Sequence, residues 1–226
     1  MSQRPLRTVA SVVLRGCLLT AAVVAAGGCG IPAFFGLVLR NAEETGDHLE
    51  EAEYTNMTEQ SFGVIIAADR SIQADHPSLV QYLTQRVTAE LMENTDATGV
   101  VPADRVLGYQ YNNPSWSARE YIEIADEFGV DRLVVIDLQE FRLHDPGNSY
   151  LWDGQAAASV VVLERDSITP NDFAFRKFLQ VGFPDTNGLG PAQLREEVVR
   201  TELAIRLSNR ISWLFYDKEV PNSLPY

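Results

Sequence analysis

The run Leu133-Val134-Val135-Ile136 constrains the fold of this chain more than any other segment. Successive side chains of a β-strand point to opposite faces of the sheet, and all four of these side chains are apolar. A strand of this kind has to be covered on both faces or lie between other strands. We therefore expect the strand from Leu133 to Leu143 in the interior of a sheet, with its more polar second half reaching solvent.

The other segments predict a sheet with helices packed on it. Further strands are expected at 62–68, 155–163 and 173–183, with a short, weak strand region at 100–109 that Pro102 interrupts. Apolar residues about four apart predict helices between Pro77 and Gly99, between Ser117 and Gly129, and from Pro191 to Tyr216. The order β-α-β-α-β-β-β-α predicts an α/β (α+β) fold with a mixed sheet of four to five strands.

The first 28 residues have the organisation of a secretory signal peptide. Arg4, Arg7 and Arg15 lie in a stretch without acidic residues, and the apolar run 17–26 follows the first two of them. This run of about ten residues is shorter than the ~20 that a membrane-spanning helix needs. We therefore expect residues 1–28 to be a cleaved signal peptide.

The segment Ala26-Gly27-Gly28-Cys29 resembles the lipobox of bacterial lipoproteins, in which small residues precede a cysteine that becomes acylated. The alternative is an ordinary signal peptide that leaves Cys29 as a free thiol. Since Cys17 lies inside the signal, the mature chain would keep one cysteine and could form neither a disulfide framework nor a multi-thiolate metal site. We predict that Cys29 carries the membrane anchor, and Gly30 favours the periplasm-facing outer membrane.

Residues 29–60 are predicted to be this anchor followed by an acidic, solvated tether, and residues 61–226 a single α/β domain. The chain is 46% hydrophobic and 22% charged, which is globular composition. Its formal net charge of −13 repels phosphate backbones, so nucleic-acid binding is disfavoured.

The junction from Ala125 to Asp131, which leads from a helix through Gly129 into the strand at Leu133, carries a family resemblance. Together with the opening strand and the terminal helix, it resembles the family that includes the amino-terminal domain of TolB, the curli secretion lipoprotein CsgG and the penicillin-binding-protein activator LpoB. The resemblance runs from Phe62 to Tyr216, with Val130 where the family usually has alanine. It implies an envelope lipoprotein and brings no catalytic motif. A CsgG-type pore would need long lipid-facing hairpins, for which the sequence has no spare segments.

Reactive side chains form no recognisable catalytic or metal-binding motif. His48, His76 and His144 lack metal-ligand spacing and are each expected at the surface. Neither a phosphate-binding glycine loop nor a GxSxG nucleophile elbow occurs. Asp137 and Glu140, three apart on one strand, are expected on opposite faces. We therefore expect no enzymatic activity, no cofactor and no metal.

Two groups of residues are candidates for binding. Asp69 and Arg70 directly follow the first strand, and ligands of α/β sheets often bind at the carboxyl ends of strands. The alternative for this pair is a turn with a surface ion pair. Tyrosine and tryptophan are enriched at interface hot spots, and core packing or loop anchoring is the simpler alternative for them. The aromatic candidates are Tyr109, Tyr111, Trp116, Tyr150 and Trp152.

These observations favour a membrane-anchored, non-enzymatic lipoprotein that binds a protein partner in cell-envelope assembly or transport. The alternative is an anchored small-molecule or glycan-binding domain that uses the cleft beside Asp69 and Arg70. A deep apolar pocket with convergent polar groups would favour the second hypothesis. An envelope hydrolase would need a pair of facing carboxylates, which the sequence does not indicate.

Overall fold

The computed structural model describes residues 47–169 and 172–221, and residues 49–220 form one compact unit. The predicted signal peptide and Cys29 lie outside the described residues. Within the described part of the chain, none of the helices has the length and apolar character that crossing a membrane requires.

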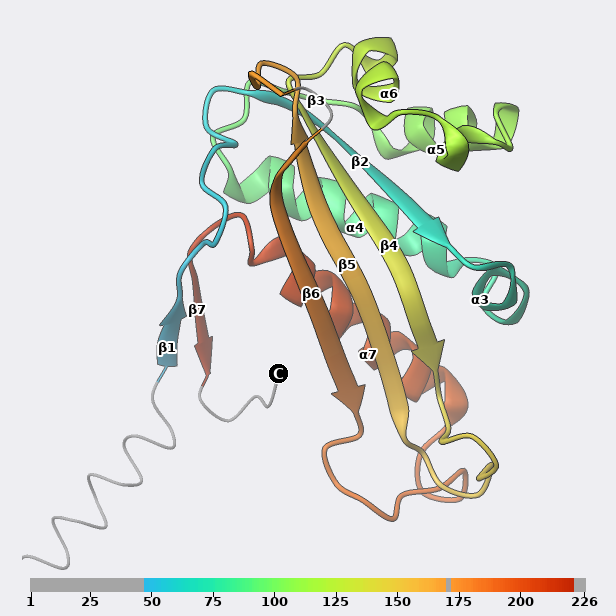
Figure 1. Ribbon diagram of the computed structural model, residues 1–226. Helices are drawn as coiled ribbons and strands as arrows, with labels where there is room; N and C mark the ends of the chain where they lie inside the picture. Colours follow the sequence, from blue (N-terminus) through green and yellow to red (C-terminus); the bar gives the residue numbers. More distant parts are fainter. Residues whose placement is uncertain (1–46, 170–171, 222–226) are drawn as a thin grey trace, which may run out of the picture. The chain divides into compact units, whose positions relative to one another are not determined.

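A mixed five-stranded sheet organises the unit, in the order β3-β2-β4-β5-β6 (Figure 1). The strands are β2 (Ser61–Ala68), β3 (Gly99–Val100), β4 (Arg132–Arg142), β5 (Gly154–Glu164) and β6 (Phe173–Phe183). β2 runs parallel to β3 and β4, whereas β4, β5 and β6 are successively antiparallel. The predicted α+β class and mixed sheet are confirmed, and β4 is the middle strand, as its apolar first half requires.

Helices cover the two faces of the sheet to different extents. α4 (Leu79–Asn94) and α7 (Glu196–Ser212) pack on one face, where Val134 and Ile136 belong to the larger core cluster. α5 (Ala103–Asn112) and α6 (Tyr121–Phe128) pack on the other face, against Leu133 and Val135. The second pair of helices is short. Asp137 and Gln139 on the same face of β4 are therefore exposed, as expected for the second half of this strand.

A β-bulge between Leu138 and Glu140 changes the predicted alternation of β4. Asp137 lies opposite Ser159, and Glu140 lies opposite Ala157, two residues further along β5. Because residues two apart on a strand share a face, Asp137 and Glu140 lie on the same face, which corrects the prediction that they lie on opposite ones. Glu140 pairs with Arg142 at 2.6 Å.

The predicted strand region 100–109 is mostly wrong. Only Gly99–Val100 forms a strand, and Ala103–Asn112 is helical. Val106 and Tyr109, three apart, face the core together, which is the spacing of a helix. The structure also contains two short helices that the sequence analysis omitted: α3 (Arg70–Asp75) and the 3₁₀ turn η1 (Trp116–Ala118).

Part of the predicted tether belongs to the core. Tyr54 and Met57 are buried, with 5% and 1% of their surface exposed. The backbone N–H groups of Glu53 and Tyr54 both donate to the carbonyl of Leu214, just after α7. Tyr54 and Met57 therefore pack into the core beside the sheet and α7, because these side chains find partners far along the chain, whereas most of the other residues from 53 to 60 are exposed. β1 (Asp47–Glu50) pairs with β7 (Lys218–Pro221) in a separate two-stranded sheet.

Candidate functional site: the strand-end cleft

The connections of β2 create a crevice at its carboxyl end. The chain leaves β2 through α3 and α4 on one face of the sheet and reaches β3, and it then crosses to β4 through α5 and α6 on the other face. This reversal is a topological switch point, where ligands of α/β sheets characteristically bind. Asp69 and Arg70, the two residues predicted to contact a ligand at this end, follow β2 directly.

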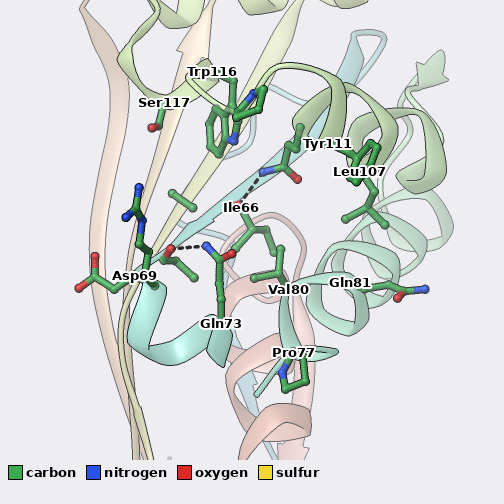
Figure 2. Close-up of a pocket in the computed structure, with 15 residues that line it drawn as sticks. Ile66, Asp69, Gln73, Pro77, Val80, Gln81, Leu107, Tyr111, Trp116 and Ser117 are labelled. Carbon is green, nitrogen blue, oxygen red and sulfur yellow. Dashed lines mark hydrogen bonds between the residues drawn. The ribbon is translucent and has the colours of Figure 1, made fainter. Parts of the chain in front are cut away.

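A cleft of about 690 Å³ lies at this point, and we call it the strand-end cleft (Figure 2). Its floor is the end of β2, and its walls come from α3, the start of α4, and the segment from α5 to η1. Its volume falls within the ~300–1,000 Å³ typical of ligand sites. The cleft is open and lined by mixed polar and apolar groups, so it is not the deep apolar pocket that would favour a small-molecule site outright.

Two glutamine side chains hold the end of β2. Nε2 of Gln110 donates to the carbonyl of Ile66 at 2.8 Å, and Nε2 of Gln73 donates to the carbonyl of Ala68 at 2.6 Å (Figure 2). Oε1 of Gln110 is buried and has no hydrogen-bond partner among the described residues. A buried acceptor without a partner costs free energy, so a ligand that offers a donor would be stabilised here. Neither glutamine was among the predicted site residues, because no sequence motif distinguishes them.

Asp69 and Arg70 both line the cleft and are exposed. In the described part of the chain neither side chain forms an ion pair, which removes the alternative of a surface pair between them. Both charges are therefore available to a ligand. Asp69 is the only carboxylate among the described lining residues, and no histidine accompanies it. The lining thus holds charged and amide groups for recognition, with Asp69 as its one carboxylate among the described residues.

The predicted aromatic residues separate into three environments. Tyr111 and Trp116 line the cleft; Tyr111 is 85% exposed, whereas the Trp116 side chain is buried. Tyr109 lies on the buried face of α5, and its hydroxyl accepts a hydrogen bond from Arg119 at 2.8 Å. Trp152 is also buried, with Nε1 donating to the carbonyl of Leu194 at 2.7 Å. Tyr150 is exposed in the loop between β4 and β5 and does not line the cleft.

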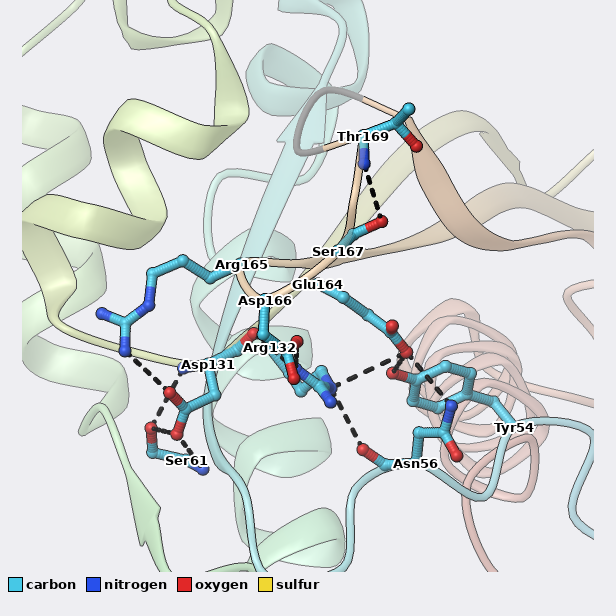
Figure 3. Close-up of polar contacts among 10 residues, drawn as sticks. All are labelled: Tyr54, Asn56, Ser61, Asp131, Arg132, Glu164, Arg165, Asp166, Ser167 and Thr169. Carbon is cyan, nitrogen blue, oxygen red and sulfur yellow. Dashed lines mark hydrogen bonds and ion pairs between the residues drawn. The ribbon is translucent and has the colours of Figure 1, made fainter.

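A second polar cluster lies at the opposite end of β2 and β4 (Figure 3). The buried guanidinium of Arg132 donates to Asp166 at 2.5 Å and to the carbonyl of Asn56 at 3.1 Å. Arg132 thereby holds the pKa of Asp166 below its usual range. The hydroxyl of Tyr54 donates to Glu164 at 2.8 Å, and burial raises the pKa of this tyrosine. These contacts join residues 54–56 to the sheet, so the cluster is structural.

The described residues contain no group of three or more histidine, cysteine or acidic side chains that could hold a metal ion. No protein-family model matches the sequence, and no curated protein matches it either.

Several solved structures are similar to this chain at low identity. Lipoprotein GNA1162 from Neisseria meningitidis is 14% identical with a TM-score of 0.44, covering 67% of this chain and 97% of that one. The PelC dodecamer from Paraburkholderia phytofirmans is 11% identical with a TM-score of 0.40, covering 75% and 96%. Protein XCC0632 from Xanthomonas campestris, of the DUF330 family, is 9% identical with a TM-score of 0.43, covering 75% and 89%. With TM-scores below 0.5, neither a family nor a function follows from these similarities, and the resemblance to the TolB, CsgG and LpoB family stays a prediction.

Proposed function

We propose that this chain is a lipid-anchored, non-enzymatic lipoprotein of the bacterial cell envelope whose domain binds a segment of a partner protein in the strand-end cleft. The anchor is the acylated Cys29, which follows the small-residue motif at the end of the signal peptide. The expected location is the periplasmic face of the outer membrane, and the role is in envelope assembly or transport. The domain requires neither a cofactor nor nucleic acid for this role.

The single observation that carries the proposal is the lining of the strand-end cleft. An exposed tyrosine ring, Tyr111, lines the same cleft as side-chain amides and the charged groups of Asp69 and Arg70. Large aromatic side chains contribute much of the free energy at protein interfaces, and amides match the donors and acceptors of a peptide backbone. The open form of the cleft suits an extended segment of chain better than an enclosed small molecule.

A glycan is the second candidate, and the same lining favours it specifically. Sugar hydroxyl groups can donate to the unpartnered Oε1 of Gln110 and to Asp69, and the apolar face of a sugar ring can lie against Tyr111. Fluorescence of the purified protein, compared with a Trp116→Phe variant, would report a glycan entering the cleft. A saturable change that requires Trp116 would favour this candidate over the protein partner.

Photo-crosslinking in living cells tests the leading proposal. A photo-reactive phenylalanine analogue replaces Tyr111 in one variant and Tyr150 in a matched control, since these tyrosines are 85% and 83% exposed. We expect one discrete protein adduct from position 111 and none from position 150. Adducts from position 150 alone would place the interaction outside the strand-end cleft, and no adduct from either would contradict a protein partner at this site.

A further inference from the structure

A smaller cavity, distinct from the strand-end cleft, lies between the start of α4 and α7. Its volume is about 140 Å³. Its lining comes from three places: His76 and Ser78, which precede α4, Leu79 and Tyr82 in the first turn of α4, and Arg200, Thr201 and Ala204 of α7. The volume falls well below the ~300 Å³ at which sites for drug-sized ligands begin, so the cavity suits a single small functional group.

Two buried nitrogen atoms in the walls of this cavity lack partners. Nδ1 of His76 and Nε of Arg200 are both buried, and neither has a hydrogen-bond partner among the described residues. His76 is only 9% exposed, which corrects the prediction that it is a surface residue. Its ring stands edge-on to Phe141, with centroids 4.8 Å apart. Buried polar atoms are almost always hydrogen-bonded, so these two nitrogens are candidates for contact with a ligand.

The charges around the cavity favour an anion. The first turn of α4 contains no acidic residue, and Ser78 at its amino-terminal cap makes no side-chain capping bond. The partial positive charge of this helix end is therefore unneutralised by its own residues. The guanidinium of Arg200 adds a full positive charge; Glu196 binds its Nη2 and leaves Nε facing no acceptor. Asp75, beside His76, is exposed.

We propose that this cavity binds a carboxylate group, with one oxygen at Nδ1 of His76 and the other at Nε of Arg200. Two unpartnered nitrogens match the two oxygens of a carboxylate, and the hydroxyl groups of Ser78, Tyr82 and Thr201 also line the cavity, so phosphate is the anion to compare. Leu79 and Ala204 give the cavity apolar walls that can take the alkyl part of the ligand. Ordered water is the alternative occupant, because a cavity of this size can hold several molecules.

Binding of a carboxylate should change the titration of His76. Burial, followed by the charge of Arg200, lowers the pKa of His76, whereas Asp75, Glu196 and a hydrogen bond to the backbone of Phe141 act in the opposite direction. The lowered pKa favours the neutral imidazole. A bound carboxylate favours the imidazolium, so it raises this pKa, and binding strengthens as the pH falls.

Nuclear magnetic resonance of the full chain in detergent, labelled at histidine, tests the proposal, because the chain has three histidines. We expect acetate to shift the His76 resonance with a dissociation constant on the order of millimolar and to raise its pKa, while His48 and His144 stay unchanged. Inorganic phosphate is the competing probe. Arg200→Gln should weaken acetate binding about tenfold, whereas Arg195→Gln, with the same loss of charge nearby, should not.

The carboxylate could belong to the carboxyl terminus of a peptide or to a small organic acid. A dipeptide with a free carboxyl terminus, compared with the same dipeptide amidated at that terminus, distinguishes the two sources. If the His76 resonance shifts with the free dipeptide and not with the amide, the ligand is the carboxyl terminus of a peptide chain. If it shifts with acetate alone, the ligand is a small organic acid. The proposal is overturned if no carboxylate probe shifts His76, if phosphate shifts it equally, or if Arg200→Gln leaves acetate binding unchanged. A melting temperature of Arg200→Gln close to that of the parent excludes unfolding as the cause.

Discussion

Single polar side chains at the start of β4 stabilise the junction between two distant strands. Asp131 accepts hydrogen bonds from the hydroxyl of Ser61 at 2.6 Å and from its backbone N–H at 3.0 Å, and it pairs with Arg165 at 2.7 Å. These contacts, led by the Ser61 hydroxyl, hold the pKa of Asp131 below its usual range. The bonds join β2 to β4 across 70 positions of sequence.

We expect Asp131→Asn to lower the free energy of unfolding by about 1 kcal/mol at pH 7, because it weakens charge-assisted bonds at a partly exposed site. A depressed folded-state pKa stabilises the fold above the unfolded-state pKa of about 3.9, and this stabilisation is lost as the pH falls through the folded-state value. The difference between variant and parent should therefore shrink in acid, as the pH falls below the unfolded-state pKa and through the lower folded-state one.

Urea titrations at several pH values provide the measurement. Asp126→Asn is the control, since this exposed carboxylate on α6 should contribute under about 0.5 kcal/mol. A difference for Asp131→Asn that persists unchanged in acid would exclude the carboxylate as its origin.

Among the secondary-structure elements, β4 is the one whose substitution should affect the fold most. Val135 is 2% exposed and packs under α6, whereas Gln139 on the same strand is exposed. Val135→Asp should destabilise the protein by about 3–5 kcal/mol, because a carboxylate would enter the core without a partner. Gln139→Asp should cost less than about 0.5 kcal/mol. Comparable urea midpoints for the two variants would show that β4 is not the buried middle strand.

For the molecule as a whole, the burial of Tyr54 and Met57 changes where the domain is expected to begin. A chain shortened to residues 49–220 should unfold cooperatively with nearly full stability. A chain that begins at Phe62 should lose at least about 3 kcal/mol, since truncating a single buried methionine already costs about 2–5 kcal/mol. Thermal melts of the two fragments provide the comparison. Equal melting temperatures would restore the sequence-based boundary near residue 61.

The proposed attachment to the membrane depends on Cys29, which lies outside the described part of the chain. We expect Cys29→Ala to move the protein from the membrane to the soluble fraction of the envelope, because acyl chains contribute about 0.8 kcal/mol per buried CH₂ group. Membrane fractionation measures the change, and mass spectrometry of the parent should find an acylated amino-terminal cysteine. An unmodified terminus, or a variant that stays with the membrane, would contradict the lipoprotein assignment.

The sequence alone determined those strands and helix ends whose residue pattern lies within the element itself. The strands 62–68, 133–143, 155–163 and 173–183 were predicted within one or two residues, because their apolar character is continuous or alternates with period two. The end of helix α6 at Gly129 was also predicted from a local feature, the glycine itself. Its φ of 72° lies in a region that glycine adopts without strain. The position of the strand-end cleft also followed from a local rule, through Asp69 and Arg70.

Tertiary structure alone decided the features that depend on residues far apart in sequence. The short segment 103–112 fits a strand or a helix by its pattern, and packing of Val106 and Tyr109 against the sheet selects the helix. Tyr54 and His76 are flanked by polar sequence, yet both are buried by segments more than 60 residues away. Gln73 and Gln110 meet at one cleft because two helices on opposite faces converge at the end of β2. The spacing of apolar residues shows which face of a helix or strand is buried. It does not show which distant segment covers that face, because this depends on how the segments are arranged in space.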